Sequence, residues 1–340
     1  MVGYPLSMLA SLLVLSTMVT TISVDRGAYS ITAEAIGSGK PVVAIAGGPG
    51  FSGNAVWGIG FGARERCRTY LFNQLGTGSS KLKNPDGELA SHVSLEGTVQ
   101  DLEALRKRVG AKKWTVVGQS WGVIVALVYA ATHPTAIDHL VLTSVPGIGA
   151  EGFVLGKNLD RIVPSDVMKT VLDLDLQTGL SEPEKIKMQV ATLMPYYFID
   201  AEMGKQTAER APKDMFNPNV FIALRKNILN PSGYEDLISR LPKVFKSPVT
   251  MIQGHQDPCG SAMPFLLKEK FLPQAKVELL DSCGHFGWIE DRQMFFHAYL
   301  SALKVPLPPY LAHPDPDENP AWQRELEAMK KNGWPFGHGQ

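Results

Sequence analysis

The chain has 340 residues, and its 33 Lys and Arg balance its 33 Asp and Glu, so the formal net charge is zero. A zero net charge without a basic run supplies no electrostatic footprint for nucleic acid. With 44% hydrophobic and 19% charged residues, the composition excludes disordered, collagen-like, coiled-coil and polytopic membrane classes. Three cysteines without a CxxC pair exclude a disulfide-dense scaffold and a structural zinc site. The length predicts two domains, or one core with a large insertion.

The N-terminal segment carries no charged side chain before Asp25. Its apolar stretch, Met8–Thr20, is followed by small residues of the kind that a signal peptidase accepts. We therefore predict that residues 1–23 are a secretory signal peptide, although the usual basic start is missing, and that the exported protein (periplasmic or secreted) begins near Val24. Two alternatives stay open. An uncharged segment of this length could be a membrane anchor, or it could be an extended N-terminal segment of a cytoplasmic protein.

From residue 27 onwards, short apolar runs typical of strands alternate with amphipathic helical patterns. This alternation predicts an α/β fold with a mainly parallel sheet and helices on both faces. The predicted strands are Ala28–Ala35, Val42–Ala46, Thr69–Asn73, Trp114–Val117, His139–Leu142, Val249–Gln253 and Val277–Leu280. The predicted helices are Thr98–Val109, Trp121–Thr132, Pro264–Phe271 and Arg292–Leu303. The core therefore comprises residues 24–147 and 247–304.

The alternation stops in the middle of the chain. Residues 148–246 carry helical signals without strand signals, including a capping box at Ser181–Glu184 and helical patterns at Asn219–Leu229 and Tyr234–Leu241. Because an insertion of this length is too long for a strand–helix loop, we predict a helical cap over the sheet. Residues 305–340 are predicted to form a Pro-rich tail with one short helix.

The sequence Gly118-Gln119-Ser120-Trp121-Gly122 fits the pattern G-x-S-x-G and lies between a predicted strand and a predicted helix. That is the context of a nucleophile elbow, in which a tight turn projects the serine hydroxyl above the sheet. A side chain two residues before or after the serine would clash in such a turn. The two glycines, Gly118 and Gly122, avoid that clash. We therefore predict that Ser120 is a nucleophile.

A serine hydroxyl is a poor nucleophile until a base takes its proton. His285 is the best candidate base, because it follows the predicted strand Val277–Leu280, and such sheets place reactive groups beyond the carboxyl ends of their strands. Asp257 follows the preceding strand and would fix the imidazole tautomer and stabilise the imidazolium. The chain order Ser120, Asp257, His285 is the order of the triad in α/β-hydrolases. We predict that these three residues form a catalytic triad.

The run Ala46-Gly47-Gly48-Pro49-Gly50 follows the predicted strand Val42–Ala46. An oxyanion hole needs a backbone N–H at this place, and glycines let a substrate carbonyl approach the backbone closely. The partner N–H would belong to Trp121. The alternative interpretation of the run is a plain Gly-Pro turn.

With these motifs the chain resembles the proline iminopeptidase family of α/β-hydrolases. The segments that carry the resemblance are Gly47–Gly50, Asn73–Ser80, Asp101–Arg106 and Gly118–Gly122. The resemblance covers roughly residues 28–147 and 247–304, and it fades through the cap and the tail.

The resemblance implies an α/β-hydrolase fold and a serine hydrolase activity. It implies that Ser120 is the nucleophile, His285 the base and Asp257 the acid that orients the base. It also implies that the Gly48 and Trp121 amides are the oxyanion donors. No metal and no organic cofactor is implied.

The chain departs from the family at three places. The family usually has His before Gly-Gly-Pro-Gly, where this chain has Ala46. The family's Asp-Gln-Arg-Gly is Asn73-Gln74-Leu75-Gly76 here, a loss of an acid and a base together that is tolerable if the two formed a pair. The aromatic–acid cluster W-x-x-W-E, which holds a free amino terminus, is missing from residues 148–246. Glu202 and Glu209 could bind an ammonium group, but charges on a helix surface are the simpler interpretation.

The sequence thus predicts an α/β-hydrolase with a helical cap that cleaves an amide or ester through an acyl-enzyme, as a proline iminopeptidase does. One alternative is a carboxylesterase of small acyl esters, and another is a catalytically silent hydrolase-fold protein that binds a ligand. The expected partner is a small-molecule or short-peptide substrate. No nucleic acid is expected, and no stable membrane partner unless the N-terminal segment is an uncleaved anchor.

Cys259 and Cys283 lie two residues after Asp257 and two residues before His285. Contact between the acid and the base would bring their two loops side by side, so that the cysteines could form a disulfide if the protein is exported. A cytoplasmic location would instead dictate two buried free thiols.

Overall fold

A computed structural model of the chain describes residues 19–229 and 232–308, together with Glu327. Nine of its strands form one sheet with the order β1-β2-β4-β3-β6-β7-β8-β9, and β5 pairs with β2. The strands are β1 (Thr20–Asp25), β2 (Tyr29–Gly37), β3 (Lys40–Ile45), β4 (Cys67–Asn73), β5 (Lys81–Leu82), β6 (Trp114–Gln119), β7 (Ile137–Thr143), β8 (Val249–Gly254) and β9 (Lys276–Leu280). The sheet is parallel from β4 through β3 to β9, and the pairs that involve β2 are antiparallel. This confirms the predicted α/β fold.

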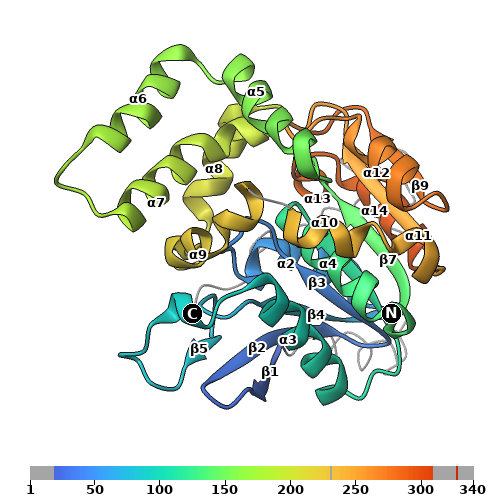
Figure 1. Cartoon of the computed structure of the whole chain (residues 1–340). Coiled ribbons are helices and arrows are strands. Elements are labelled where there is room, and N and C mark those ends of the chain that lie inside the picture. Colours follow the sequence, from blue (N-terminus) through green and yellow to red (C-terminus); the bar gives the residue numbers. More distant parts are fainter. Residues whose placement is uncertain (1–18, 230–231, 309–326, 328–340) are drawn as a thin grey trace, which may run out of the picture.

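Helices cover both faces of the sheet (Figure 1). One apolar cluster joins the sheet to α3 (Leu95–Arg108), α4 (Trp121–Thr132), α10 (Ser232–Ile238), α11 (Leu241–Val244) and α12 (Met263–Phe271). A second cluster joins the opposite face to α2 (Trp57–Gly62), α13 (Gly287–Glu290) and α14 (Arg292–Ala302). Within the described residues, none of the helices is long and apolar enough to cross a membrane.

The strands are apolar throughout because both faces of the sheet are covered. In β3, Val43 and Ile45 belong to the first cluster, whereas Val42 and Ala44 belong to the second. All four side chains are completely buried. Continuous apolar runs of this kind made the central strands predictable, and each predicted strand matches an observed strand with ends that differ by at most two residues.

Strand β1 was not predicted, and it crosses the expected end of the signal peptide. Thr20 to Asp25 pair with β2 in a continuous antiparallel register. Arg68 also donates a hydrogen bond from Nη2 to the Thr20 hydroxyl, at 3.0 Å. A chain that begins at Val24 would lose Thr20–Ser23, most of the strand. Residues 1–18, the rest of the predicted signal peptide, lie outside the described residues, and export remains a prediction.

The cap consists of helices α5 (Phe153–Ile162), α6 (Ser165–Leu176), α7 (Glu182–Leu193), α8 (Ala201–Arg210) and α9 (Pro218–Leu229), with the short helix η5 (Met194–Tyr197) before α8. Helices α5 to α8 lie together beyond one end of the sheet (Figure 1).

The predicted cap, residues 148–246, extends past the point where the chain returns to the core. Tyr234 and Ile238 of α10 and Leu241 of α11 are buried in the cluster that includes α4. These last two helices therefore belong to the layer that covers the sheet. Of the predicted tail, residues 309–326 and 328–340 lie outside the described residues.

Candidate active site

Ser120 occupies the turn between β6 and α4, and its backbone has a positive φ, with φ 54° and ψ −119°. Few residues other than glycine adopt a positive φ, so this is a strained position. Its two flanking glycines are required by contact distances. A Cβ at Gly118 would lie 2.5 Å from the Gly122 carbonyl oxygen, and a Cβ at Gly122 would lie 2.2 Å from the Ile45 carbonyl oxygen. The turn therefore has the geometry that the G-x-S-x-G pattern predicts.

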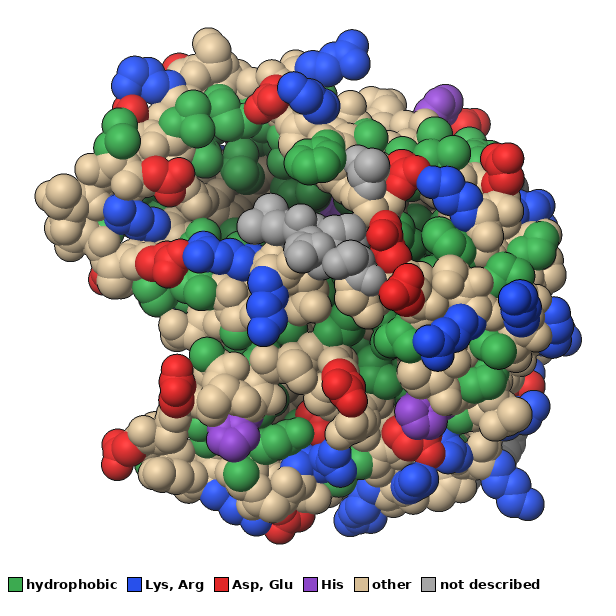
Figure 2. All heavy atoms as spheres, viewed as in Figure 1, with side chains coloured by type: hydrophobic (Ala, Val, Ile, Leu, Met, Phe, Trp, Pro, Cys, Tyr) green, Lys and Arg blue, Asp and Glu red, His purple; other side chains and the backbone are tan. Residues whose placement is uncertain are grey.

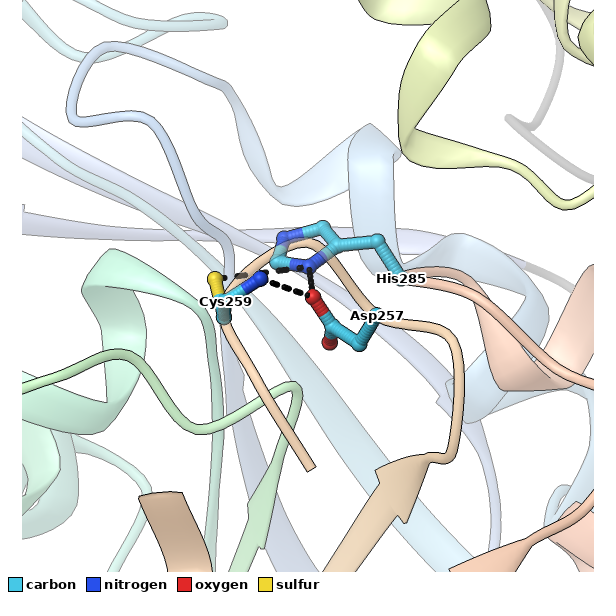
Figure 3. A group of neighbouring side chains, drawn as sticks. All are labelled: Asp257, Cys259 and His285. Carbon is cyan, nitrogen blue, oxygen red and sulfur yellow. Dashed lines mark hydrogen bonds and ion pairs between the residues drawn. The ribbon is translucent and has the colours of Figure 1, made fainter. Parts of the chain in front are cut away.

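Asp257 and His285 are joined by a buried hydrogen bond (Figure 3). The imidazole Nδ1 lies 2.9 Å from Asp257 Oδ1, and the side chains are 3% and 0% exposed. Because a carboxylate only accepts hydrogen bonds, Nδ1 donates in this pair, and in a neutral imidazole Nε2 is then the acceptor. The two residues follow β8 and β9, neighbouring strands of the sheet. The predicted contact between the acid and the base is present.

Ser120 and His285 lie at the same edge of the sheet, each hydrogen-bonded to the end of β7. The Ser120 N–H donates to the Thr143 carbonyl at 3.1 Å, and the next residue, Ser144, donates from its hydroxyl to the His285 carbonyl at 2.5 Å. His285 is 3% exposed, whereas Ser120 is half-buried. Among the described hydrogen bonds, none joins the Ser120 hydroxyl to the imidazole. Such contacts often tighten only when substrate is bound.

The glycine loop after β3 lies directly against the elbow. The Gly47 N–H donates to Gln119 Oε1 at 3.0 Å, and a Cβ at Gly47 would lie 2.8 Å from Ser120 Cβ. Gly48 has φ +109°, a conformation that strains any residue with a side chain. Trp121 is the first residue of α4, so its N–H has no carbonyl partner within the helix. Both predicted oxyanion donors therefore belong to segments next to Ser120.

Of the two alternatives left open for Cys259 and Cys283, the structure has the free thiols, because all three cysteines of the chain are free and buried. The two loops do lie side by side, since a Cβ at Gly254 would be 2.0 Å from the Gly284 carbonyl oxygen. Their thiols occupy different surroundings, however. The Cys259 sulfur is 3.8 Å from His285 Nδ1, whereas Cys283 is buried in the apolar cluster with α13 and α14. Burial raises the pKa of both thiols well above the ordinary value.

Asp257, Cys259 and His285 are the one group of three in the described residues whose ligand atoms could hold a metal ion, with those atoms within 4.8 Å of one another. The same Nδ1 and carboxylate atoms already form the acid–base hydrogen bond. A metal ion would therefore have to replace that bond.

The departures from the family pattern have local explanations. Asn73 donates from Nδ2 to Glu34 at 3.0 Å and accepts the Gly53 N–H at 2.8 Å, and Leu75 is 4% exposed in an apolar cluster. The acid and the base of the family motif are thus replaced by a neutral amide and an apolar residue. Glu202 and Glu209 are both exposed on α8, as expected of surface charges.

Three residues next to the site were not identified from the sequence. Ser144 has φ +55° and bonds to the His285 carbonyl. Glu290 of α13 and Tyr197 of the cap accept hydrogen bonds from the backbone of the loop that contains His285. The position of Ser144 after a central strand was a usable signal, whereas nothing in a single sequence places a cap carbonyl against a core loop.

Comparison with known proteins agrees with this geometry. A family model described as the alpha/beta hydrolase fold matches residues 40–291. A proline iminopeptidase of Lactobacillus helveticus (strain DPC 4571) is 26% identical over 262 residues, which cover 74% of this chain and 85% of that protein.

Solved structures resemble the chain in fold. An alpha/beta fold family hydrolase from Bacillus anthracis str. Sterne has a TM-score of 0.63 and 18% identity, and the match covers 84% of this chain and 99% of that one. An esterase from Exiguobacterium antarcticum has a TM-score of 0.60 and 18% identity, with 85% and 100% of the two chains covered. At this level of identity the likeness establishes the fold alone.

Proposed function

The chain belongs to the alpha/beta hydrolase fold family, and we propose that it is a serine hydrolase that cleaves an amide or ester through an acyl-enzyme on Ser120. The observation that carries this proposal is the buried His285–Asp257 hydrogen bond, at the same edge of the sheet as the strained Ser120. A hydrogen-bonded acid–base pair next to a serine in an elbow has the geometry of nucleophilic catalysis.

In the first half-reaction, the Ser120 hydroxyl oxygen attacks the substrate carbonyl carbon while its proton passes to His285 Nε2. The carbonyl electron pair moves to oxygen, and the Gly48 and Trp121 N–H groups donate to the resulting oxyanion. Asp257 accepts the hydrogen bond from the Nδ1–H group and stabilises the imidazolium. When the intermediate collapses, the bond to the leaving group breaks, and the leaving alcohol or amine takes the proton from Nε2. Ser120 is left as an acyl ester.

In the second half-reaction, a water molecule attacks the acyl ester and gives a proton to Nε2. The ester bond to Ser120 breaks, the serine oxygen recovers the proton, and the carboxylic acid leaves. The cycle restores the neutral imidazole, with no net change to the protein. Pre-placed N–H donors and an oriented base suffice for this chemistry, so the proposal requires no further cofactor.

Amide cleavage at a free amino terminus is the first specific candidate, because the relatives named proline iminopeptidase align with most of this chain. A second candidate, ester cleavage, is favoured by the cap. In helices α5 to α9 the half-buried carboxylate, Asp173, is paired with Lys169, and the other carboxylates, Glu202 and Glu209 among them, are exposed. A substrate ammonium group needs a free carboxylate inside the site. In these helices, neither the carboxylate paired with a lysine nor the exposed carboxylates provide one.

The test is to assay the purified protein against two classes of substrate in parallel: amino-acid arylamides, including a proline arylamide, and short-chain aryl esters. The protein is also treated with a fluorophosphonate probe, and the labelled residue is identified by mass spectrometry. We expect hydrolysis of at least one class and labelling of Ser120. Ser120→Ala should lose both, since removal of a serine nucleophile costs up to about 10⁶ in kcat. The matched variant Ser91→Ala, at an exposed position, should keep both.

Hydrolysis of the ester alone would select the second candidate. Labelling of Ser120 without hydrolysis of either class would leave the substrate open. Absence of both would contradict the proposed activity and favour a silent hydrolase-fold protein.

A further inference from the structure

One segment of the cap, residues 195–217, contacts both loops that the reaction would use. We call it the bracket. At its first end, the His285 N–H donates to the Tyr197 carbonyl at 2.8 Å. Next to it, the Ile199 N–H donates to Glu290 Oε1 at 2.8 Å. The rings of Phe198 and Phe286 stack with centroids 4.7 Å apart. The bracket is therefore joined to the backbone of the base itself.

Glu290 links the bracket to the residues on either side of His285. Its Oε2 accepts the Gly284 N–H at 3.1 Å and the Phe286 N–H at 3.0 Å, while Oε1 accepts from the bracket. The side chain is largely buried, and burial raises its pKa from the ordinary value. A buried carboxylate is costly unless hydrogen bonds satisfy it, and here three backbone donors do so. The three bonds hold two segments against one carboxylate: the cap, and the loop between β9 and α13, residues 281–286, which we call the histidine loop.

The second end of the bracket contacts the loop after β3, residues 46–52, which contains Gly48 and which we call the oxyanion loop. The Ser52 N–H donates to the Met215 carbonyl at 2.8 Å, and the Asn217 N–H donates to the Gly50 carbonyl at 2.9 Å. These bonds form a short antiparallel bridge between Phe51 and Phe216, three residues beyond Gly48. The Asn217 side chain adds a bond from Nδ2 to the Gly76 carbonyl at 2.7 Å. The same cap segment is thus bonded to the loop that would carry the oxyanion donor.

The two ends are connected by α8, which packs closely against the start of the bracket. A Cβ at Gly204 would lie 2.6 Å from the Pro195 carbonyl oxygen and 2.9 Å from the Phe198 ring. Asp200 caps α8 by accepting the Glu202 N–H at 2.8 Å. Because backbone atoms are in direct contact, α8 and the first end cannot shift independently without opening this contact.

We propose that the bracket positions the histidine loop and the oxyanion loop together, through Glu290 of α13 at the first end and through its own Asn217 at the second, and that these two are positioning residues. The inference rests on the proposed function, and it assigns the cap a part in assembling the catalytic groups besides shaping the substrate site. A displacement of α8 would withdraw the hydrogen bonds of the His285 backbone and of Gly50 at once. Small displacements of catalytic groups are costly, with about 100-fold in rate for about 1 Å.

The first test replaces Glu290 by glutamine. A glutamine has one carbonyl oxygen, so it can accept from the histidine loop or from the bracket, and its NH₂ group then faces an N–H donor on the other side. We expect Glu290→Gln to lower kcat by roughly 10- to 100-fold while KM stays within about twofold. Rates are normalised to active sites titrated with the fluorophosphonate. The matched control Glu269→Gln, at an exposed position on α12, should retain the wild-type kcat.

The second test asks whether Glu290 and the bracket act through the same bond. Ile199→Pro removes the N–H that Glu290 Oε1 accepts, and it should also lower kcat. In the double variant, the glutamine NH₂ no longer faces an N–H. The combined loss should therefore be no larger than the larger single loss, whereas independent effects would multiply.

The third test addresses the other end. Asn217→Ala removes the side-chain bonds with the Gly76 carbonyl and the Asn219 N–H, and so loosens the residue whose backbone N–H bonds to Gly50. It should lower kcat by roughly tenfold at constant KM, whereas Asn219→Ala, at an exposed position, should not. A wild-type kcat in Glu290→Gln overturns the inference, as does a fall in melting temperature without a fall in kcat per titrated site. These outcomes require a wild-type protein that hydrolyses substrate, so failure of the proposed function is seen first and separately.

Discussion

The sheet core and the cap differ in how completely their apolar side chains are covered. The central strands are buried on both faces, and Val42 to Ile45 have no exposed surface. Helices α5 and α6 of the cap leave Phe153 and Leu176 74% and 78% exposed. Figure 2 shows hydrophobic side chains at the surface of this part of the molecule. The core is therefore specified by its own packing, whereas much of the cap is held at a few contact points, among them those of the bracket.

The glycines show the same difference. In the core, a Cβ at Gly118, Gly122 or Gly254 would meet backbone atoms at 2.5 Å or less. In the cap, a Cβ at Gly156 or Gly179 would meet no atom within 4 Å. The cap glycine that does pack closely, Gly204, belongs to the bracket. In helices α5 to α9, close packing at a glycine thus coincides with the segment that contacts the functional loops.

The largest expected effect is on the acid–base pair of the core. Asp257→Asn replaces an acceptor-only carboxylate by an amide that can donate, so His285 would present the wrong tautomer to Ser120. We expect kcat to fall by about 10⁴ with little change in folding. Steady-state kinetics with the best substrate, together with a far-UV spectrum and a thermal melt, measure both. A kcat within tenfold of wild type would contradict the role of Asp257.

The next effect is on the stability of the core. Gly122→Ala would place a methyl group 2.2 Å from the Ile45 carbonyl oxygen, and that backbone atom belongs to a buried central strand. Overpacking of this kind typically costs up to about 3 kcal/mol. Denaturant unfolding should show this loss in free energy, and activity should fall because the elbow is displaced. A variant as stable as wild type would mean that the elbow relaxes more easily than its contacts indicate.

A smaller loss is expected at the edge of the sheet. A chain that begins at Val24 lacks Thr20–Ser23, residues of β1 that pair with β2. A chain that begins at Val19 keeps them. We expect the shorter chain to be less stable by about 1–3 kcal/mol, and thermal melts of the two chains measure the difference. Equal stability would show that β1 contributes nothing. N-terminal sequencing of protein from the native host then tells whether cleavage occurs, and whether it spares this strand.

The parts of the structure that follow from local pattern were predictable from the sequence. Buried strands and the amphipathic helices between them have strong periodic signals, and the Gly118–Gly122 motif identifies the elbow by its own chemistry. The order of strands then placed Asp257 next to His285. Strand β1 was missed because its side chains alternate between buried and exposed in a segment that also fits an export signal.

The features that depend on side-chain direction or on distant contacts were not predictable. Neighbouring loops suggested a disulfide, but Cys259 lies beside His285 while Cys283 is buried in another cluster. The bracket joins residues of the cap to loops more than 80 positions away in the chain. A single sequence carries no signal for such backbone hydrogen bonds.

The smallest predicted effect tests whether the cap unfolds with the core. Gly156 lies inside α5, where a Cβ would meet no atom within 4 Å. Gly156→Ala therefore adds no clash, and it removes the entropic cost of a glycine in a helix, worth about 0.5–1 kcal/mol. If the hydrogen bonds of the bracket make the cap and the core one cooperative unit, the whole protein should melt about 1–4 °C higher.

Hydrogen exchange separates this expectation from its alternative. A cap that opens by itself would gain amide protection in α5 without any change in the melting temperature, because the added stability would then belong to a local unit. A shared unit requires that Gly156→Ala raise the protection of β6 and β8 as well as α5, while kcat stays unchanged because Gly156 lies outside the bracket. The cap would then be coupled to the core by the same few bonds that position the base.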